Sequence, residues 1–182
     1  VRMLTSGTTG PPKRVDLAYD MLAVSVIGTD FTTAPAPTAV SGSVAIVNAP
    51  LVHIGGGVYR ILQCICQARP FVLLPRFELA SWLLRCAATP PKAVSLVPAA
   101  LRMVLQSDLG PDDLAGGVRA VTSGTAPLSA EDADAFFDKF GIPVLTSYAA
   151  TEFGGGGVAG WTLADHRRYW DASEAAWAAQ PG

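Results

Sequence analysis

The stretch VRAVTSGTAPLSAEDADAFFDKFGIPVLTSY, residues 118–148, decides the fold. Apolar runs at residues 118–122 and 144–148 are short and rich in β-branched side chains. They lack strict polar alternation, which is typical of strands covered on both faces. Between them, apolar side chains recur at helical spacing over residues 133–140. The stretch therefore predicts a strand, a crossover helix and a second strand parallel to the first.

The start of this helix carries a capping pattern. Ser129 precedes the apolar stripe, and Asp132 follows three residues later, where a glutamate is usual. A serine hydroxyl at this position can accept a hydrogen bond from a free backbone N–H of the first turn. The helix is therefore expected to begin directly after Ser129.

The same alternation extends outward along the chain. Further apolar runs that predict strands are residues 44–47, 71–74 and 93–97. Helical spacing recurs over residues 58–65 and 79–86 and, in a shorter form, over residues 98–105. Right-handed crossovers join such elements most simply. We therefore expect an α/β fold, a largely parallel sheet with helices on both faces.

Composition excludes several classes of protein. Of 182 residues, 50% are apolar and 15% charged, with a net charge of -2, so the chain is neither disordered nor a binder of nucleic acid through bulk charge. No apolar run is long enough to predict a membrane span. The chain has an odd number of cysteines, Cys64, Cys66 and Cys86. This number favours free thiols packed in a core, in a reducing cytoplasm, and we prefer this interpretation to a zinc site. Apolar excess also predicts self-association through faces meant for missing neighbours.

A segment near the N-terminus concentrates anion-binding groups. LTSGTTGPPK, residues 4–13, combines hydroxyls, glycines and Lys13. Glycines let backbone N–H groups approach an anion, and the lysine adds charge, so the segment is suited to a triphosphate. It is not the common P-loop, because Pro12 precedes the lysine and Arg14 follows it. The alternative is a mobile Ser/Thr/Gly linker.

Two further segments follow predicted strands. SGTAPL, residues 123–128, and YAATE, residues 148–152, fall where open α/β sheets bind ligands. Tyr148 is suited to stack on a base, and Glu152 to hold Mg²⁺. The alternative makes Tyr148 a core aromatic and Glu152 a solvated loop acid.

These segments resemble those of the adenylate-forming superfamily, which includes acyl-CoA synthetases, adenylation domains of peptide synthetases and luciferases. LTSGTTGPPK is similar to the phosphate-binding loop of that family, SGTAPL to its adenine-side loop and YAATEFGG to its Y-G-x-T-E signature, in the family's order. The resemblance covers residues 1 to about 155, the second half of the family's large N-terminal domain.

The resemblance implies roles for individual residues. Around the ATP phosphates it places Thr5, Ser6, Gly7, Thr8, Thr9, Gly10 and Lys13. In the adenine pocket it places Gly124, Thr125, Ala126, Tyr148 and Ala149, the last at a position where the family has glycine. Thr151 would contact the α-phosphate region and Glu152 would hold Mg²⁺, so Lys13, Thr151 and Glu152 are the catalytic candidates. The methyl group of Ala149 makes the adenine contacts less certain than the phosphate contacts.

A fourth segment concerns the acid substrate. PLVHIGG, residues 50–56, resembles the family segment beside the acyl pocket, which makes His53 and Gly55 substrate-pocket residues. Acyl- and aryl-CoA synthetases commonly have histidine here, whereas peptide-synthetase domains usually have aspartate, so an α-amino acid is disfavoured. The alternative is a histidine bonded to backbone carbonyls in a strand-to-helix loop.

The resemblance implies a ligase that activates a fatty or aryl acid with Mg²⁺ and ATP and passes the acyl group to CoA, and the cysteine content points to the cytoplasm. Residues 1–182 are then expected to be a fragment of the AMP-binding N-terminal domain, nearly inactive without the small C-terminal domain. Two alternatives stay open: a non-catalytic nucleotide-binding or interaction module, and an adenylation domain that loads a carrier protein.

Overall fold

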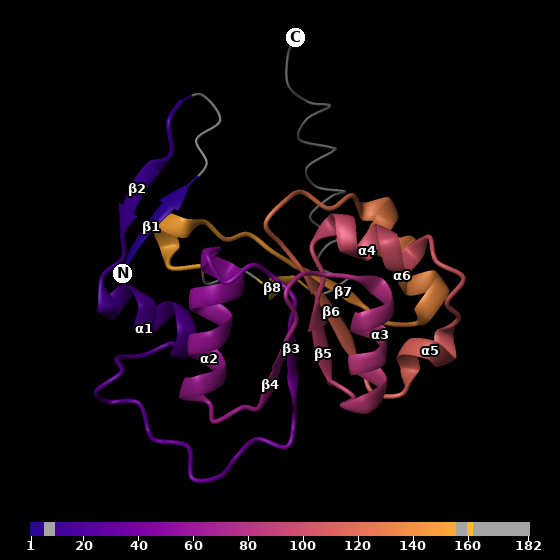
Figure 1. Cartoon of the computed structure of the whole chain (residues 1–182), viewed down its shortest axis with the longest axis horizontal. Coiled ribbons are helices and arrows are strands. Elements are labelled where there is room, and N and C mark those ends of the chain that lie inside the picture. Colours follow the sequence, from indigo (N-terminus) through magenta and orange to yellow (C-terminus); the bar gives the residue numbers. More distant parts are fainter. Residues whose placement is uncertain (6–9, 156–159, 162–182) are drawn as a thin grey trace.

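Parallel strands organise the chain in the computed structural model, which describes residues 1–5, 10–155 and 160–161. The strands of this layer are β3 (Ala45–Val47), β4 (Phe71–Leu73), β5 (Ala93–Ser95), β6 (Ala120–Ser123), β7 (Val144–Ser147) and β8 (Gly160–Trp161). β3 pairs with β4, β5 with β6 and β6 with β7 in parallel, while β8 is antiparallel to β7. β3 lies against β5, so the two ladders are neighbours (Figure 1). The five expected strands and the α/β class are confirmed.

Helices connect these strands. They are η1 (Ile54–Tyr59), which is a π-helical turn, α2 (Arg60–Cys66), α3 (Leu79–Ala88), α4 (Pro98–Leu105), α5 (Pro111–Ala115) and α6 (Ala130–Phe140). A short 3₁₀ turn, η2 (Thr151–Phe153), follows β7. All four helices expected from apolar spacing are present. In the part of the chain that the structure describes, every helix is too short or too polar to cross a membrane.

The cap of α6 forms in part as expected. The Ser129 hydroxyl accepts a hydrogen bond from the Asp132 backbone N–H at 3.2 Å. The Asp132 carboxylate, however, accepts a hydrogen bond from Arg102 Nε at 2.8 Å. The second half of the capping pattern is thus replaced by an ion pair that ties α6 to α4.

One main core fills the space between the helices and the strands. Trp82 of α3, Leu101 of α4 and Phe136 of α6 pack with Val121 of β6 and Val144 of β7, each at most 1% exposed. Each fully buried aliphatic or aromatic side chain of this kind contributes about 1.5–3 kcal/mol relative to an exposed one. The main core therefore fixes the strand ends in position.

The N-terminal part of the chain contains elements that the apolar pattern did not predict. β1 (Arg2–Thr5) and β2 (Lys13–Asp16) form an antiparallel hairpin, which is followed by α1 (Tyr19–Ile27) (Figure 1). Each strand is four residues long, with two half-buried positions in β1 and one in β2, so they leave little apolar signal. The sequence of α1 is apolar almost throughout, so it has no distinct stripe.

A second, smaller core joins this N-terminal part to the rest. We call it the small core; its buried members are Leu17, Leu22 and Ile54. Met3 and Val15 of the hairpin pack against it. A Cβ added to Gly154, directly after η2, would lie 3.5 Å from Leu22 Cδ2. The hairpin, α1, η1 and the end of η2 are thus held by the same group of side chains.

Candidate functional site

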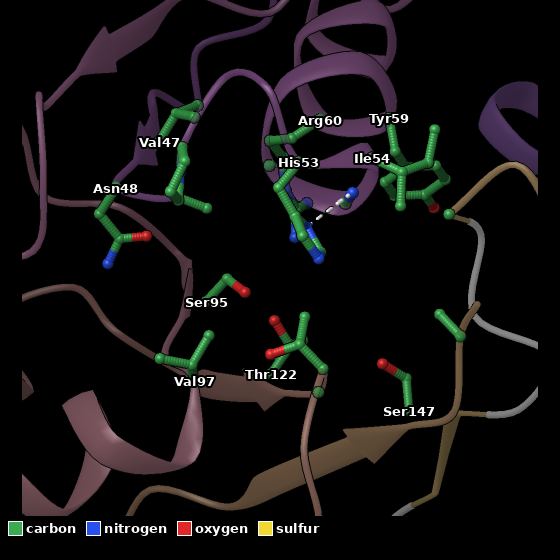
Figure 2. Close-up of a pocket in the computed structure, with 18 of the residues that line it drawn as sticks. Val47, Asn48, His53, Ile54, Tyr59, Arg60, Ser95, Val97, Thr122 and Ser147 are labelled. Carbon is green, nitrogen blue, oxygen red and sulfur yellow. Dashed lines mark hydrogen bonds between the residues drawn. The ribbon is translucent and has the colours of Figure 1, made fainter. Parts of the chain in front are cut away.

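A cavity of about 600 Å³ opens at the carboxyl ends of the parallel strands. Its walls include the strand ends at Val47, Ser95, Ser123 and Ser147. Figure 2 shows His53, Ile54, Tyr59 and Arg60 gathered on one side, with Ser95, Thr122 and Ser147 across the cavity from them. Ligands of open α/β sheets bind at this edge, so the cavity is the candidate site.

The loop after β6 contributes one wall. Gly124 and Thr125, two of the expected adenine-side residues, line the cavity, whereas Ala126 is not among its lining residues. A Cβ on Gly124 would lie 3.1 Å from Ser147 Oγ and 3.2 Å from Ser147 O, so a glycine lets the loop pass close to β7. Thr125 has a φ of 70°, which is uncommon for a β-branched residue. The backbone here is sharply turned at the cavity mouth.

The segment after β7 contributes a second wall. Ala149, Ala150, Thr151 and Gly155 line the cavity. Tyr148 is 68% exposed, which rules out the core-aromatic alternative, and it is not among the lining residues. Glu152 is exposed and follows the lining residue Thr151 directly. The structure therefore brings Ala149 and Thr151 to the cavity, whereas Tyr148 and Glu152 are exposed and do not belong to its lining.

The expected phosphate-binding segment is the connection between β1 and β2. Thr5 pairs with Lys13 across the hairpin, and Thr5 Oγ1 donates a hydrogen bond to Lys13 O at 3.5 Å. Lys13 and Gly10 are exposed and do not line the cavity. Ser6, Gly7, Thr8 and Thr9 lie outside the described residues. Met3 and Val15 of the hairpin pack against the small core, and Gly154 lies close to Leu22 of the same core, so this connection and the η2 segment are anchored at neighbouring places.

The loop before η1 positions His53. Its Nδ1 atom accepts a hydrogen bond from the Gly55 backbone N–H at 3.2 Å, and both residues line the cavity. The alternative for this histidine expected backbone carbonyls as its partners, whereas the observed partner is a backbone N–H group. Since Nδ1 is an acceptor, the neutral ring carries its proton on Nε2. His53 can then donate from Nε2 to an oxygen of a ligand.

Glycines are required where η1 meets this loop. A Cβ on Gly56 would lie 2.3 Å from Ala49 Cβ, and one on Gly57 would lie 1.7 Å from Leu51 O. Only glycine permits such close approach of the two segments. π-helical turns of this kind occur frequently at functional sites. The glycines therefore hold the His53 loop against η1.

Several lining residues were not predicted from the sequence. Asn48, Tyr59, Arg60, Ser95, Thr122, Ser123 and Ser147 belong to this set. The Ser123 side chain is 1% exposed, and its hydroxyl has no hydrogen-bond partner among the described residues. Arg60 carried one sequence signal, a basic residue within an otherwise apolar helical stretch. Burial lowers the pKa of the Arg60 guanidinium from its ordinary value.

A magnesium ion held together with phosphates needs few protein ligands. Within residues 1–5, 10–155 and 160–161, no three His, Cys, Asp or Glu side chains converge on a metal position. Mg²⁺ characteristically takes one or two carboxylates and completes its shell with phosphate oxygens and water. Glu152, which is exposed and directly follows the lining residue Thr151, is available as a single carboxylate ligand of that kind, and its exposure also matches a solvated loop acid.

The chain is similar in sequence to known enzymes. The family model described as AMP-binding enzyme matches residues 1–175. Rice 4-coumarate–CoA ligase 1 is 31% identical over 152 residues, which cover 82% of this chain and 27% of the rice protein. The chain spans about 30% of the length of the curated relatives that it matches.

Solved structures share the fold. ATP-bound MatB from Rhodopseudomonas palustris is 27% identical with a TM-score of 0.70, over 83% of this chain and 29% of that one. O-succinylbenzoate coenzyme A synthetase from Bacillus subtilis, in complex with ATP and magnesium ion, is 22% identical with a TM-score of 0.73. That match covers 92% of this chain and 33% of the other. At this identity it shows the fold alone.

Proposed function

The chain belongs to the AMP-binding enzyme family, and we propose that a protein carrying it activates a carboxylic acid with ATP and then forms a CoA thioester. In the first step the substrate carboxylate attacks the α-phosphate of ATP, giving an acyl-adenylate and pyrophosphate. In the second, the CoA thiol attacks the acyl carbon and AMP leaves. Two curated relatives, rice 4-coumarate–CoA ligase 1 and Arabidopsis thaliana 4-coumarate–CoA ligase-like 8, support this reaction class.

The observation that carries the proposal is the cavity shared by several segments at the strand ends. It joins the loop after β6, the segment after β7 and the His53 loop, three segments distant in sequence. Under the proposal, Gly124, Thr125 and Ala126 contact the adenine side, and Tyr148 stacks on the base. The β1–β2 connection, residues 5–13, binds the phosphates. His53 and Gly55 line the acid end of the cavity.

The chemistry needs donors and positive charge more than a general base. A carboxylic acid is already ionised at neutral pH, so the nucleophile needs no proton removed. Negative charge grows on phosphate oxygens, and preorganised N–H, O–H and ammonium groups stabilise it. The Thr151 hydroxyl and the Lys13 ammonium supply such groups in the proposed roles. Glu152 would hold Mg²⁺, which supplies charge compensation at the phosphates when bound.

The substrate in this proposal is a fatty or aryl acid, and the enzyme is cytoplasmic. An aspartate able to pair with an α-ammonium group is absent from the His53 position. The described lining residues also include no acidic side chain, which supports a substrate without a positive charge beside its carboxylate.

The test measures acid-dependent ATP–pyrophosphate exchange by an intact protein that contains this chain. Glu152→Ala is expected to lower the exchange rate by about tenfold or more, because a metal contributes several kcal/mol to the transition state. Glu131→Ala, an exposed acid in the first turn of α6, is the matched control and is expected to retain full activity. Unchanged exchange in Glu152→Ala would remove Glu152 from the site. Mg·ATP binding without exchange for any acid would favour a non-catalytic nucleotide-binding module instead.

A further inference from the structure

Arg60 places a cation in the wall of the cavity. It is the first residue of α2, directly after η1, and it is half-buried. Its Nη1 atom donates a hydrogen bond to Gln63 Oε1 at 3.0 Å. This contact leaves the guanidinium charged and holds it in place beside the cavity that it lines.

The charge of Arg60 has no counter-ion in the described part of the chain. The ion pairs there join Arg2 to Asp16 and Arg102 to Asp132, all outside the cavity lining. The other basic group near Arg60 is Arg69, which bonds to the Ser43 and Val44 carbonyls and the Ser43 hydroxyl. A half-buried charge without a neighbouring anionic side chain is costly, and an anionic ligand in the cavity would remove that cost.

The position of Arg60 separates it from the expected nucleotide side. Arg60 lies with His53 and Tyr59 on one side of the cavity, and Thr122 and Ser147 lie across from them (Figure 2). The loop after β6 and the segment after β7, where the adenine and α-phosphate are proposed to bind, continue from Thr122 and Ser147. The guanidinium therefore belongs to the acid end of the cavity.

We infer that Arg60 binds a second carboxylate of the substrate, so that the acid activated is a dicarboxylic acid. The inference rests on the proposed function and narrows its fatty or aryl acid to one whose far end carries an anion. A guanidinium binds a carboxylate through two parallel N–H···O hydrogen bonds, a geometry that a neutral alkyl or methyl end cannot use. The polar side chain of Tyr59, on the same side of the cavity as Arg60, is consistent with a charged far end.

The test compares acids of matched size on the intact protein that contains this chain. Glutarate is compared with pentanoate, and terephthalate with 4-methylbenzoate, by kcat/KM in ATP–pyrophosphate exchange. We expect the diacid of at least one pair to be preferred by about tenfold or more, the effect of a charged hydrogen-bonded contact. Arg60→Gln is expected to abolish the preference and Arg60→Lys to retain part of it. Arg76→Gln, an exposed arginine outside the lining, is the control and is expected to leave the preference unchanged.

Further measurements distinguish a substrate carboxylate from an ATP phosphate at Arg60. They also distinguish failure of this inference from failure of the proposed function. If Arg60 instead holds an ATP phosphate, Arg60→Gln weakens Mg·ATP binding in calorimetry and acts equally on both members of each pair, which overturns the inference. Exchange with equal kcat/KM for both acids of each pair also overturns it and leaves the proposed function standing. If the protein shows neither exchange nor Mg·ATP binding, the proposed function is overturned. Calorimetric titration of the two diacids without ATP then tests the inference by itself, and absence of diacid binding rejects it. Thermal unfolding of each variant checks that the fold is retained.

Discussion

The Nδ1 atom of His53 accepts a hydrogen bond from the backbone N–H of Gly55 at 3.2 Å. The bond spans the junction between the His53 loop and η1, and both residues line the cavity. One ring nitrogen is therefore used within the fold, and the other, Nε2, is the donor in the neutral ring. This relationship makes the tautomer of His53 a property that can be measured without any substrate.

We predict that the neutral imidazole of His53 is the Nε2–H tautomer. Long-range ¹H–¹⁵N NMR spectra, recorded at a pH where the ring is neutral, distinguish the two nitrogens by their chemical shifts. The chain has 2 histidines, so a His166→Gln variant assigns the His53 signals. A dominant Nδ1–H tautomer would show that the Gly55 bond does not form in solution.

Gly57→Ala is predicted to destabilise the protein by at least about 3 kcal/mol, the upper range for overpacking. The new methyl would lie 1.7 Å from the Leu51 carbonyl oxygen, so the turn must shift. Urea denaturation gives the free energy of unfolding. Gly116→Ala is the matched control, since a Cβ there meets nothing within 4 Å and its φ of -60° suits alanine. Equal stability of the two variants would contradict the close packing of η1 on the loop.

The main layer of the fold was predictable because its strands and its helices leave different patterns of apolar residues in the sequence. Strands such as β6 and β7 are covered by helices and so read as apolar runs, and α3 and α6 show one apolar face. β1 and β2 were missed because they are short and mainly exposed. The π-helical turn η1 was missed because its three consecutive glycines make it a poor helix by propensity.

The site was predictable only as separate segments. The sequence placed Gly124 and Thr151 after strands, and parallel strands bring such residues to one edge. It did not reveal that Arg60 faces the same cavity, because an arginine in an apolar helix is equally compatible with a surface position. That Tyr148 is exposed follows from the way the chain turns after β7, which no local pattern reports.

Stability is predicted to depend on pH through the contact between α4 and α6. The hydrogen bond from the Arg102 side chain, and to a smaller extent the Ser129 side chain, lower the pKa of the Asp132 carboxyl group below its ordinary value of 3.8. A carboxyl with a lowered pKa in the folded state adds stability above its ordinary pKa and loses it as pH falls through the lowered pKa. Arg102→Ala is expected to cost less than about 1 kcal/mol at pH 7, because the Arg102 side chain is 45% exposed.

The measurement is the free energy of unfolding of wild type and Arg102→Ala at pH 7 and at pH 2.5. The difference between the two proteins should shrink at the lower pH. Arg2→Ala is the control, because the Arg2 and Asp16 side chains are 74% and 67% exposed and their pairing is fully solvated. A difference that is the same at both pH values would show that the ion pair does not contribute.

Ser129→Ala is predicted to lower the free energy of unfolding by about 1 kcal/mol, the usual effect of removing an N-cap. The Ser129 hydroxyl accepts from the Asp132 N–H at 3.2 Å, and its loss leaves that amide without its cap. Ser129→Asn can restore the acceptor and is expected to recover most of the stability. Equal losses in both variants would contradict a capping role.

The three cysteines are predicted to react with iodoacetamide at different rates. Burial raises the pKa of the Cys86 thiol to about 12 and also raises the pKa of Cys64. At pH 8 only about one Cys86 thiol in 10,000 is then a thiolate, which is the reactive form. Cys66 is half-buried, whereas Cys64 and Cys86 are buried, so Cys66 should be labelled first.

Mass spectrometry of peptides from the native protein gives the three labelling rates, and labelling in urea gives the reference in which all three thiols react. Because Cys86 packs in the main core, its native labelling requires α3 to open, so its rate reports the free energy of that opening. Leu101→Ala, which leaves a cavity elsewhere in the same core, is expected to speed Cys86 labelling and leave the Cys66 rate nearly unchanged. If Cys86 reacted as fast as Cys66 in the native protein, α3 would not be held on the strands as the structure places it.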